Sequence, residues 1–178
     1  MIRVIFYTIA CLHLFGCASA SVSGDGLALR KSLPIQIYMG TCVVGRAGPE
    51  AVESQAIEMG FSPVSGNAAH KYLSGNTGKA WRLTNEQGQF GLTVLNNTLC
   101  SVFIHQGEPT ALQKSMEAWL PPKNSGFTYK RHSRSQSEFL ETTSYQIFRG
   151  GQLMEQWVIT INTQPGAELV AVMSYDGP

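Results

Sequence analysis

The most chemically distinctive stretch of the sequence is residues 123–134, KNSGFTYKRHSR. Four Lys or Arg side chains occur there with Phe127 and Tyr129 among them, and no acidic residue follows before Glu138. Such a patch can hold an anionic substrate, a lipid head group, a phosphate-bearing polysaccharide or an acidic protein partner. A solvated strand edge, kept unpaired by its charges, is the alternative interpretation. The candidate binding residues are Lys123, Tyr129, Lys130, Arg131, His132 and Arg134.

A second cluster, His70-Lys71-Tyr72, combines a titratable ring, a cation and an aromatic ring. It lies in residues 61–78, which are rich in Ser, Gly and Asn and contain Ser-Gly-Asn twice. We interpret this segment as a long irregular loop, and long ordered loops are often functional. The alternative is a surface connection that tolerates insertion.

Motifs of catalysis are absent from the sequence. It contains no G-x-S-x-G elbow, no H-E-x-x-H, no phosphate-binding glycine loop and no dinucleotide fingerprint. Outside the N-terminal segment the histidines are His70, His105 and His132, which could assemble a metal site only in space. We therefore predict no catalytic residue, no metal site and no cofactor.

The four cysteines divide by position. Cys11 lies in the apolar N-terminal run, Cys17 follows that run, and Cys42 and Cys100 belong to the folded part. A remaining pair in an exported chain is most simply a disulfide. We therefore predict the bond Cys42–Cys100.

The first residues have the layout of a bacterial secretory signal, a positive head followed by the apolar run 4–16 and then small residues. Leu14-Phe15-Gly16-Cys17 resembles the lipobox of bacterial lipoproteins. The resemblance implies a signal peptide over residues 1–16, lipidation of Cys17, and a membrane anchor, with Ala18 pointing to the outer membrane. Ala18-Ser19-Ala20 also resembles an A-x-A site, and cleavage after residue 20 would give a soluble periplasmic or secreted product.

Charge and composition limit the function classes. Residues 1–16 carry Arg3 as their only charged side chain, so the rest of the chain has 12 basic and 12 acidic residues. This balance, together with export, argues against a nucleic-acid partner. Residues 17–32, rich in Ser, Gly and Ala, indicate a flexible tether. Residues 33–178 suit a single globular domain.

Periodicity predicts an α+β fold. Helices are expected at 49–59 and 109–120, each opened by Pro, and a strand is expected at 35–39. Alternating segments predict a three-strand meander over 80–105 and four further strands at 127–130, 139–148, 152–162 and 167–175. We expect an antiparallel sheet of about seven strands with two helices packed on one face, in which helix plus three strands resembles a degenerate duplication.

The expected function is that of a noncatalytic exported lipoprotein that binds a partner protein in the bacterial cell envelope. Inhibitor, immunity and envelope-assembly factors are the kinds of protein that fit. The alternative is a small periplasmic enzyme, or a metal- or ligand-binding protein, acting on envelope material. The sequence carries no signal for the oligomeric state.

Overall fold

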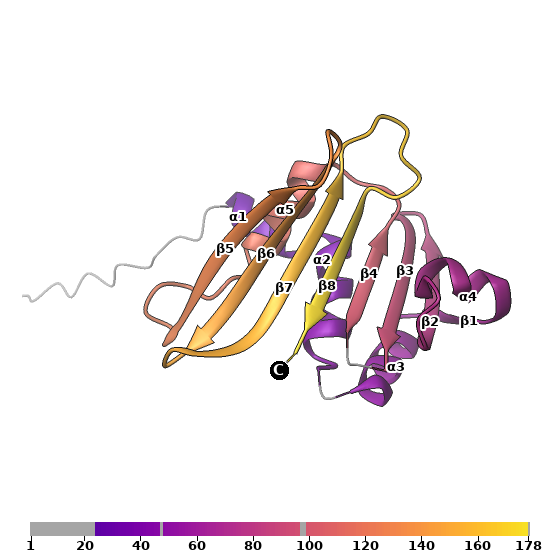
Figure 1. The fold of residues 1–178 in the computed structure, drawn as a ribbon, viewed down its shortest axis with the longest axis horizontal. Coiled ribbons are helices and arrows are strands. Elements are labelled where there is room, and N and C mark those ends of the chain that lie inside the picture. Colours follow the sequence, from indigo (N-terminus) through magenta and orange to yellow (C-terminus); the bar gives the residue numbers. More distant parts are fainter. Residues whose placement is uncertain (1–23, 47, 97–98, 178) are drawn as a thin grey trace, which may run out of the picture.

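The computed structural model describes residues 24–46, 48–96 and 99–177, which form one antiparallel sheet with helices on both faces (Figure 1). The predicted signal, the Cys17 lipid site and residues 17–23 of the predicted tether lie outside the described residues. The strands are β1 (Ser62–Val64), β2 (Gly78–Asn85), β3 (Gly88–Leu95), β4 (Cys100–Ile104), β5 (Phe127–Ser135), β6 (Leu140–Arg149), β7 (Gln152–Asn162) and β8 (Ala171–Asp176). Their order in the sheet is β1-β2-β3-β4-β8-β7-β6-β5.

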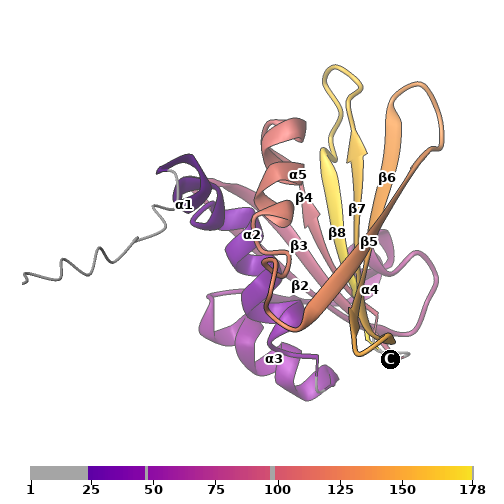
Figure 2. The same ribbon diagram turned by 90° about the vertical axis from the view of Figure 1, so that its left-hand side faces the viewer.

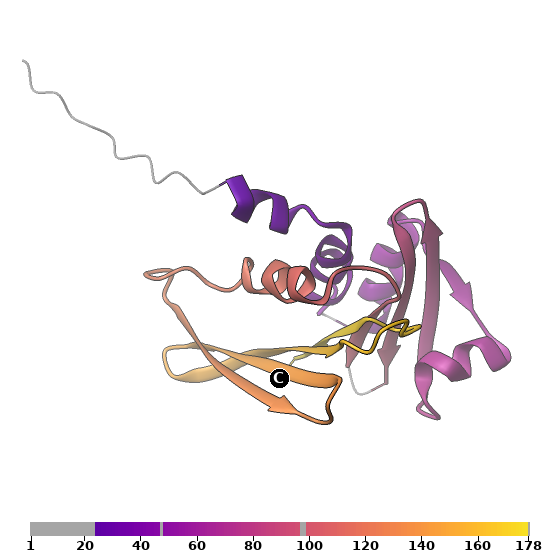
Figure 3. The ribbon, with the colours of Figure 1, turned by 90° about the horizontal axis from the view of Figure 1, so that it is seen from above.

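The helices are α1 (Gly24–Arg30), α2 (Leu33–Tyr38), α3 (Pro49–Glu58), α4 (Gly66–Leu73) and α5 (Pro109–Glu117). A π-helical segment, η1 (Met39–Val43), continues α2. Four of the helices lie on one side of the sheet and α4 lies on the other, as Figures 2 and 3 show from two directions. The α+β class and the antiparallel sheet are therefore confirmed.

A helix followed by four strands occurs twice in the described chain. The first unit is α3 with β1 to β4, interrupted by α4, and the second is α5 with β5 to β8. The two units join edge to edge, because β4 pairs with β8 over Cys100↔Tyr175 to Ile104↔Ala171. The sequence analysis expected three strands after the first helix and four after the second, about seven in all. Eight are present because β1, only three residues long, adds to the edge of the first unit.

The strand predicted at 35–39 is wrong, since these residues belong to α2 and the start of η1. A short apolar run fits a buried helix as well as a strand, and Pro34 at the first turn favours the helix. Ile35, Ile37 and Tyr38 are all fully buried between the sheet and its helices. With α1, α2 and α4 present in addition, the expectation of two helices on one face is also wrong.

The segment 61–78 is not an irregular loop, because it contains β1 and α4. The first Ser-Gly-Asn, at 65–67, marks the start of α4, and the second, at 74–76, marks its end. Ser74 adopts the left-handed conformation at φ 49°, and Gly75 follows at φ 81°. The repeated tripeptide therefore delimits a helix.

Several other predicted elements are confirmed. Helices α3 and α5 begin at Pro49 and Pro109, the meander is β2-β3-β4, and β6 and β7 form a hairpin across Gly150-Gly151. Both glycines have positive φ, as a two-residue hairpin loop requires. Within the predicted tether, residues 24–30 form α1, and Arg30 Nε donates to the carbonyl of Ala118 at 2.7 Å.

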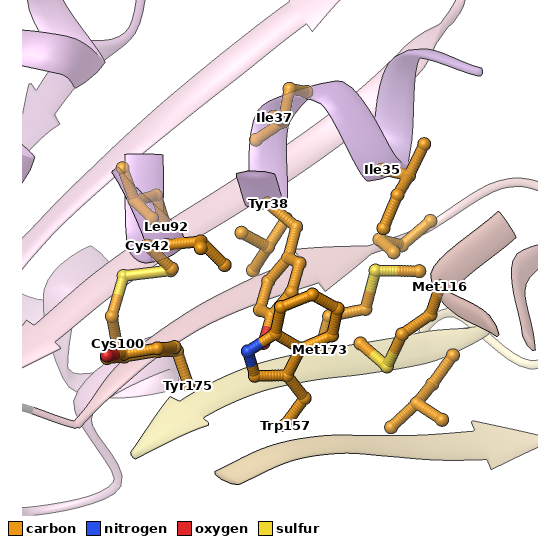
Figure 4. Close-up of a cluster of buried hydrophobic side chains, with 14 of the residues drawn as sticks. Ile35, Ile37, Tyr38, Cys42, Leu92, Cys100, Met116, Trp157, Met173 and Tyr175 are labelled. Atoms are coloured by element: carbon orange, nitrogen blue, oxygen red, sulfur yellow. A yellow bond between two sulfur atoms is a disulfide. The ribbon is translucent and has the colours of Figure 1, made fainter. Parts of the chain in front are cut away.

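The core lies between the sheet and the helices of its covered face. Tyr38 packs edge to face on Trp157, with ring centroids 6.0 Å apart (Figure 4). Beside them the predicted disulfide joins Cys42 of η1 to Cys100 of β4, so this bond is confirmed. It fastens the helical layer to the strand at which the two units meet.

Candidate functional site

The basic residues of 123–134 all lie along one edge of the sheet. Strand β5 pairs with β6 over its whole length, and no strand of the described part pairs with its outer edge. Every β5 residue after Phe127 is exposed. Lys123 precedes the strand in an exposed turn that contains Asn124 at φ 70° and Gly126 at φ 81°. The sequence patch is therefore an exposed edge.

Strand alternation divides this patch between two faces. Arg131 and Tyr129 face the helical layer, where Arg131 Nε lies 3.5 Å from Oε1 of Glu117. The same oxygen accepts a hydrogen bond at 2.6 Å from the hydroxyl of buried Tyr145, the register partner of Arg131. Arg131 is thus tied to α5 as part of the fold.

Lys130, His132 and Arg134 form the other row, which we call the cationic row. They occupy alternate positions on the face opposite α5, so they span about 13 Å at the usual strand rise. No ion pair to any of the three is found among the described residues. Lys130 Nζ lies 5.2 Å from the ring centroid of Phe148. The cationic row therefore remains available to an anionic partner.

The sheet surface beside the cationic row carries polar side chains and, among them, the half-buried Val158 and Val172. Thr142 and Thr160 hydrogen-bond through their hydroxyls at 2.9 Å, and Gln146 donates to Gln156 at 3.3 Å. Ser174, farther along the sheet, hydrogen-bonds Ser101 at 2.8 Å. In Figures 2 and 3 no helix covers this side of β5, β6 and β7. This surface is therefore of mixed polarity and uncovered.

The second predicted cluster lies on α4. Lys71 and Tyr72 line a hollow of about 540 Å³ between α4 and the loop 163–170 that leads into β8, whereas His70 is exposed and does not line it. Arg82, His105 and Glu168 are also in its wall. The structure therefore brings two of the three predicted residues together with side chains from distant parts of the chain.

Tyr72 is fixed by close packing. Its ring lies edge to face against Phe103, with centroids 5.3 Å apart, and against His105 at 6.5 Å. A β-carbon at Gly91, in the middle of β3, would overlap the Tyr72 ring. Gly91 thus leaves space for the ring on the sheet.

We expect Gly91→Ala to lower the free energy of unfolding by about 1 to 3 kcal/mol, because the added methyl must push Tyr72 from its place. Chemical denaturation of the single variants and of Gly91→Ala combined with Tyr72→Leu measures the coupling. An interaction free energy of about 0.5 kcal/mol or more is expected between the two positions. If the losses of unfolding free energy in the two single variants simply add in the double variant, the contact between Gly91 and Tyr72 is contradicted.

The histidines do not assemble a metal site. His105 and His132 lie on opposite sides of β8, β7 and β6 in the sheet order, and no group of three His, Cys, Asp or Glu side chains in the described residues could hold a metal ion. His105 Nδ1 instead lies 2.8 Å from the carbonyl oxygen of Glu168, which ties the end of β4 to the loop 163–170. The described residues therefore do not bring His105 and His132 into one cluster.

Sequence reasoning did not place Arg82, Phe103 and Glu168 in a candidate site. Arg82 and Phe103 both lie on the α4 side of the sheet, where they flank Gly91 on neighbouring strands. Strand alternation would have placed Arg82 and Phe103 on one face. The sequence did not indicate that α4 and the loop 163–170 cover that face.

Comparisons with known proteins give no family for the chain. No family model, no curated protein and no solved structure matches it. Among the described residues, no helix has the length and apolar character needed to cross a membrane.

Proposed function

We propose that the protein is a noncatalytic binding module exported to the bacterial cell envelope, and that it binds an acidic segment of a partner protein at strand β5. The proposal keeps the predicted signal peptide, the lipid anchor at Cys17 and the outer-membrane location. Inhibition, immunity and envelope assembly are the roles that such binding serves.

The observation that carries this proposal is the cationic row on an exposed edge strand. An edge strand offers unpaired backbone N–H and C=O groups that an extended peptide can bind by strand addition. Lys130 and Arg134 add charge that selects acidic side chains along the added strand, and the imidazole of His132 between them adds a hydrogen-bonding group. Backbone pairing would supply affinity and the cationic row would supply specificity.

The disulfide supports the proposed location. Cys42 and Cys100 form a bond of the type that persists in the periplasm and outside the cell. The bond is compatible with both a lipid-anchored and a freely soluble product.

Site-specific photo-cross-linking in the native envelope tests the proposal. A photoreactive residue at Thr128, on the same face as the cationic row, should capture an acidic partner. The same residue at Ser62, on the opposite edge strand β1, is the matched control and should not capture that protein.

Replacing the cationic row with Lys130→Gln, His132→Gln and Arg134→Gln should weaken the captured interaction about tenfold, because two exposed charge pairs and one histidine contact together contribute about 1 to 2 kcal/mol. Added salt should weaken the wild-type interaction and change that of the variant less. The variant should keep the thermal stability of the wild type, since all three side chains are exposed. Capture that is equal for the wild type and the variant would refute the proposal that the cationic row binds the partner through its charges.

A further inference from the structure

We propose that the hollow between α4 and the loop 163–170 binds a small organic anion with an aromatic body. This site is separate from the cationic row, and the inference does not depend on the proposed partner. A volume of about 540 Å³ falls within the range of small-molecule sites in proteins.

The charges around the hollow favour an anion. Lys71 of α4 and Arg82 of β2 both line it, and no ion pair to either is found among the described residues. Glu168 is the one carboxylate in the described lining. Two cations against one anion leave a net positive wall, and an Arg guanidinium suits a planar carboxylate.

The aromatic side chains supply a rigid apolar surface. Tyr72 and Phe103 meet edge to face, and the Tyr72 ring packs directly against Gly91. An aromatic ring of the ligand can stack on or meet these rings at little cost in conformational entropy. A ligand that joins a flat ring to a carboxylate therefore matches both parts of the wall.

The far side of the hollow is held in position as well. His105 Nδ1 contacts the carbonyl oxygen of Glu168 at 2.8 Å, and the backbone N–H of Val170 donates to the carbonyl of Ile104 at 2.9 Å. These contacts attach the loop 163–170 to the end of β4. The hollow is thus bounded on both sides before any ligand enters, which reduces the cost of ordering on binding.

Benzoate titrated into the disulfide-bonded, isotopically labelled protein tests the site by NMR. We expect saturable shifts at Tyr72, Phe103 and Glu168, with a millimolar dissociation constant as the natural scale for so small a probe. Benzamide has the same shape without the charge, and acetate has the charge without the ring. Both should bind at least about tenfold more weakly than benzoate.

Three substitutions sharpen the test. Lys71→Gln and Arg82→Gln should each weaken benzoate binding about threefold to tenfold. Glu168→Gln should instead tighten it about twofold to fivefold, because it removes the opposing carboxylate and keeps the backbone carbonyl that contacts His105. A misfolded variant would not gain affinity, so this gain separates a binding effect from a stability effect.

Lys130→Gln, which removes a cation of the row on β5, is the control and should leave benzoate binding unchanged. Shifts that are scattered over the surface, or equal affinity for benzoate and benzamide, would overturn the proposal. So would a loss of affinity in Glu168→Gln. If partner binding at β5 fails, capture from the envelope is lost while benzoate binding persists. If this site fails, benzoate binding is lost while capture persists.

Discussion

Removal of the disulfide is expected to lower the free energy of unfolding by about 4 kcal/mol. Cys42 and Cys100 are 58 residues apart in the sequence, and the segment between them contains α3, β1, α4, β2 and β3. Without the bond the unfolded chain gains the conformational freedom of this loop, and the folded state gains nothing equivalent. The expected change is a large part of the about 5 to 15 kcal/mol that stabilises a typical domain.

Two measurements separate loop entropy from lost packing. Cys42→Ala combined with Cys100→Ala removes two sulfur atoms from positions that are almost completely buried, so it also creates a cavity. Wild-type protein unfolded with a reducing agent present loses the bond and keeps both sulfurs. We expect both samples to melt about 8 to 16 °C below the oxidised wild type, with the alanine variant the lower of the two.

A loss below about 1 kcal/mol in reduced wild-type protein would contradict this expectation. It would mean that the unfolded chain is already held together by residual structure, which a cross-link then hardly restricts. A loss close to 4 kcal/mol would instead make folding sensitive to the redox compartment. The domain would then be stable in an oxidising envelope and marginal in a reducing cytoplasm.

The elements that could be predicted from the sequence are those with a local physical cause. Pro49 and Pro109 start helices because proline fits the first helical turn, and Gly150-Gly151 closes a hairpin because both residues take positive φ. The Cys42–Cys100 bond followed from counting cysteines. Each of these depends on a few neighbouring residues or on a simple pairing rule.

The errors arose where burial decides the structure. The run at 35–39 is apolar except for the exposed Gln36, and so short a run fits a buried helix or a buried strand equally well. Its position between the sheet and the other helices, together with Pro34 at the first turn, favours the helix. Similarly, α4 is short and rich in polar residues, and it is held by Tyr72 packing over Gly91 rather than by a strong local preference.

The candidate sites show the same division. The cationic row could be found because its residues are close together in sequence, and strand alternation then separates Lys130 from Arg131. The hollow could not be found, because Lys71, Arg82 and Glu168 come from a helix, a strand and a loop that meet only in the folded chain. The sequence identified Lys71 and Tyr72 on the α4 side of this site, and strand alternation could add Arg82 only as a residue on one face of the sheet.

Unfolding by alkali is the second large effect that we expect, and buried tyrosines cause it. Tyr38 and Tyr145 are fully buried, and Tyr175 is 3 % exposed. Burial, with a Glu117 hydrogen bond as the second cause, raises the pKa of Tyr145 to about 12. Burial and the nearby charge of Glu155 raise the pKa of Tyr175 to about 12, and the same two causes raise the pKa of Tyr38 well above its ordinary value.

The sign of the effect follows from the direction of these shifts. In the unfolded chain a tyrosine ionises with a pKa near 10.0, whereas the folded protein keeps these phenols neutral to higher pH. Their contribution to stability is therefore complete below pH 10 and is lost as the pH rises through about 12. Tyr145 and Tyr175 should each contribute about 3 kcal/mol of this loss.

An alkaline titration, followed by tyrosinate absorbance and by near-ultraviolet circular dichroism, measures the unfolding transition. We expect the absorbance of the buried phenolates to rise together with the loss of tertiary structure, because unfolding returns the pKa of each phenol to near 10.0. Tyr175→Phe removes one of the linked ionisations and should move the unfolding midpoint to higher pH. Tyr129→Phe, at a ring that is 45 % exposed, is the matched control and should leave the midpoint unchanged. Full ionisation of all the tyrosines with an intact near-ultraviolet spectrum would show that water reaches Tyr38 and Tyr145 in the folded state, and the coupling between their burial and alkaline unfolding would then be wrong.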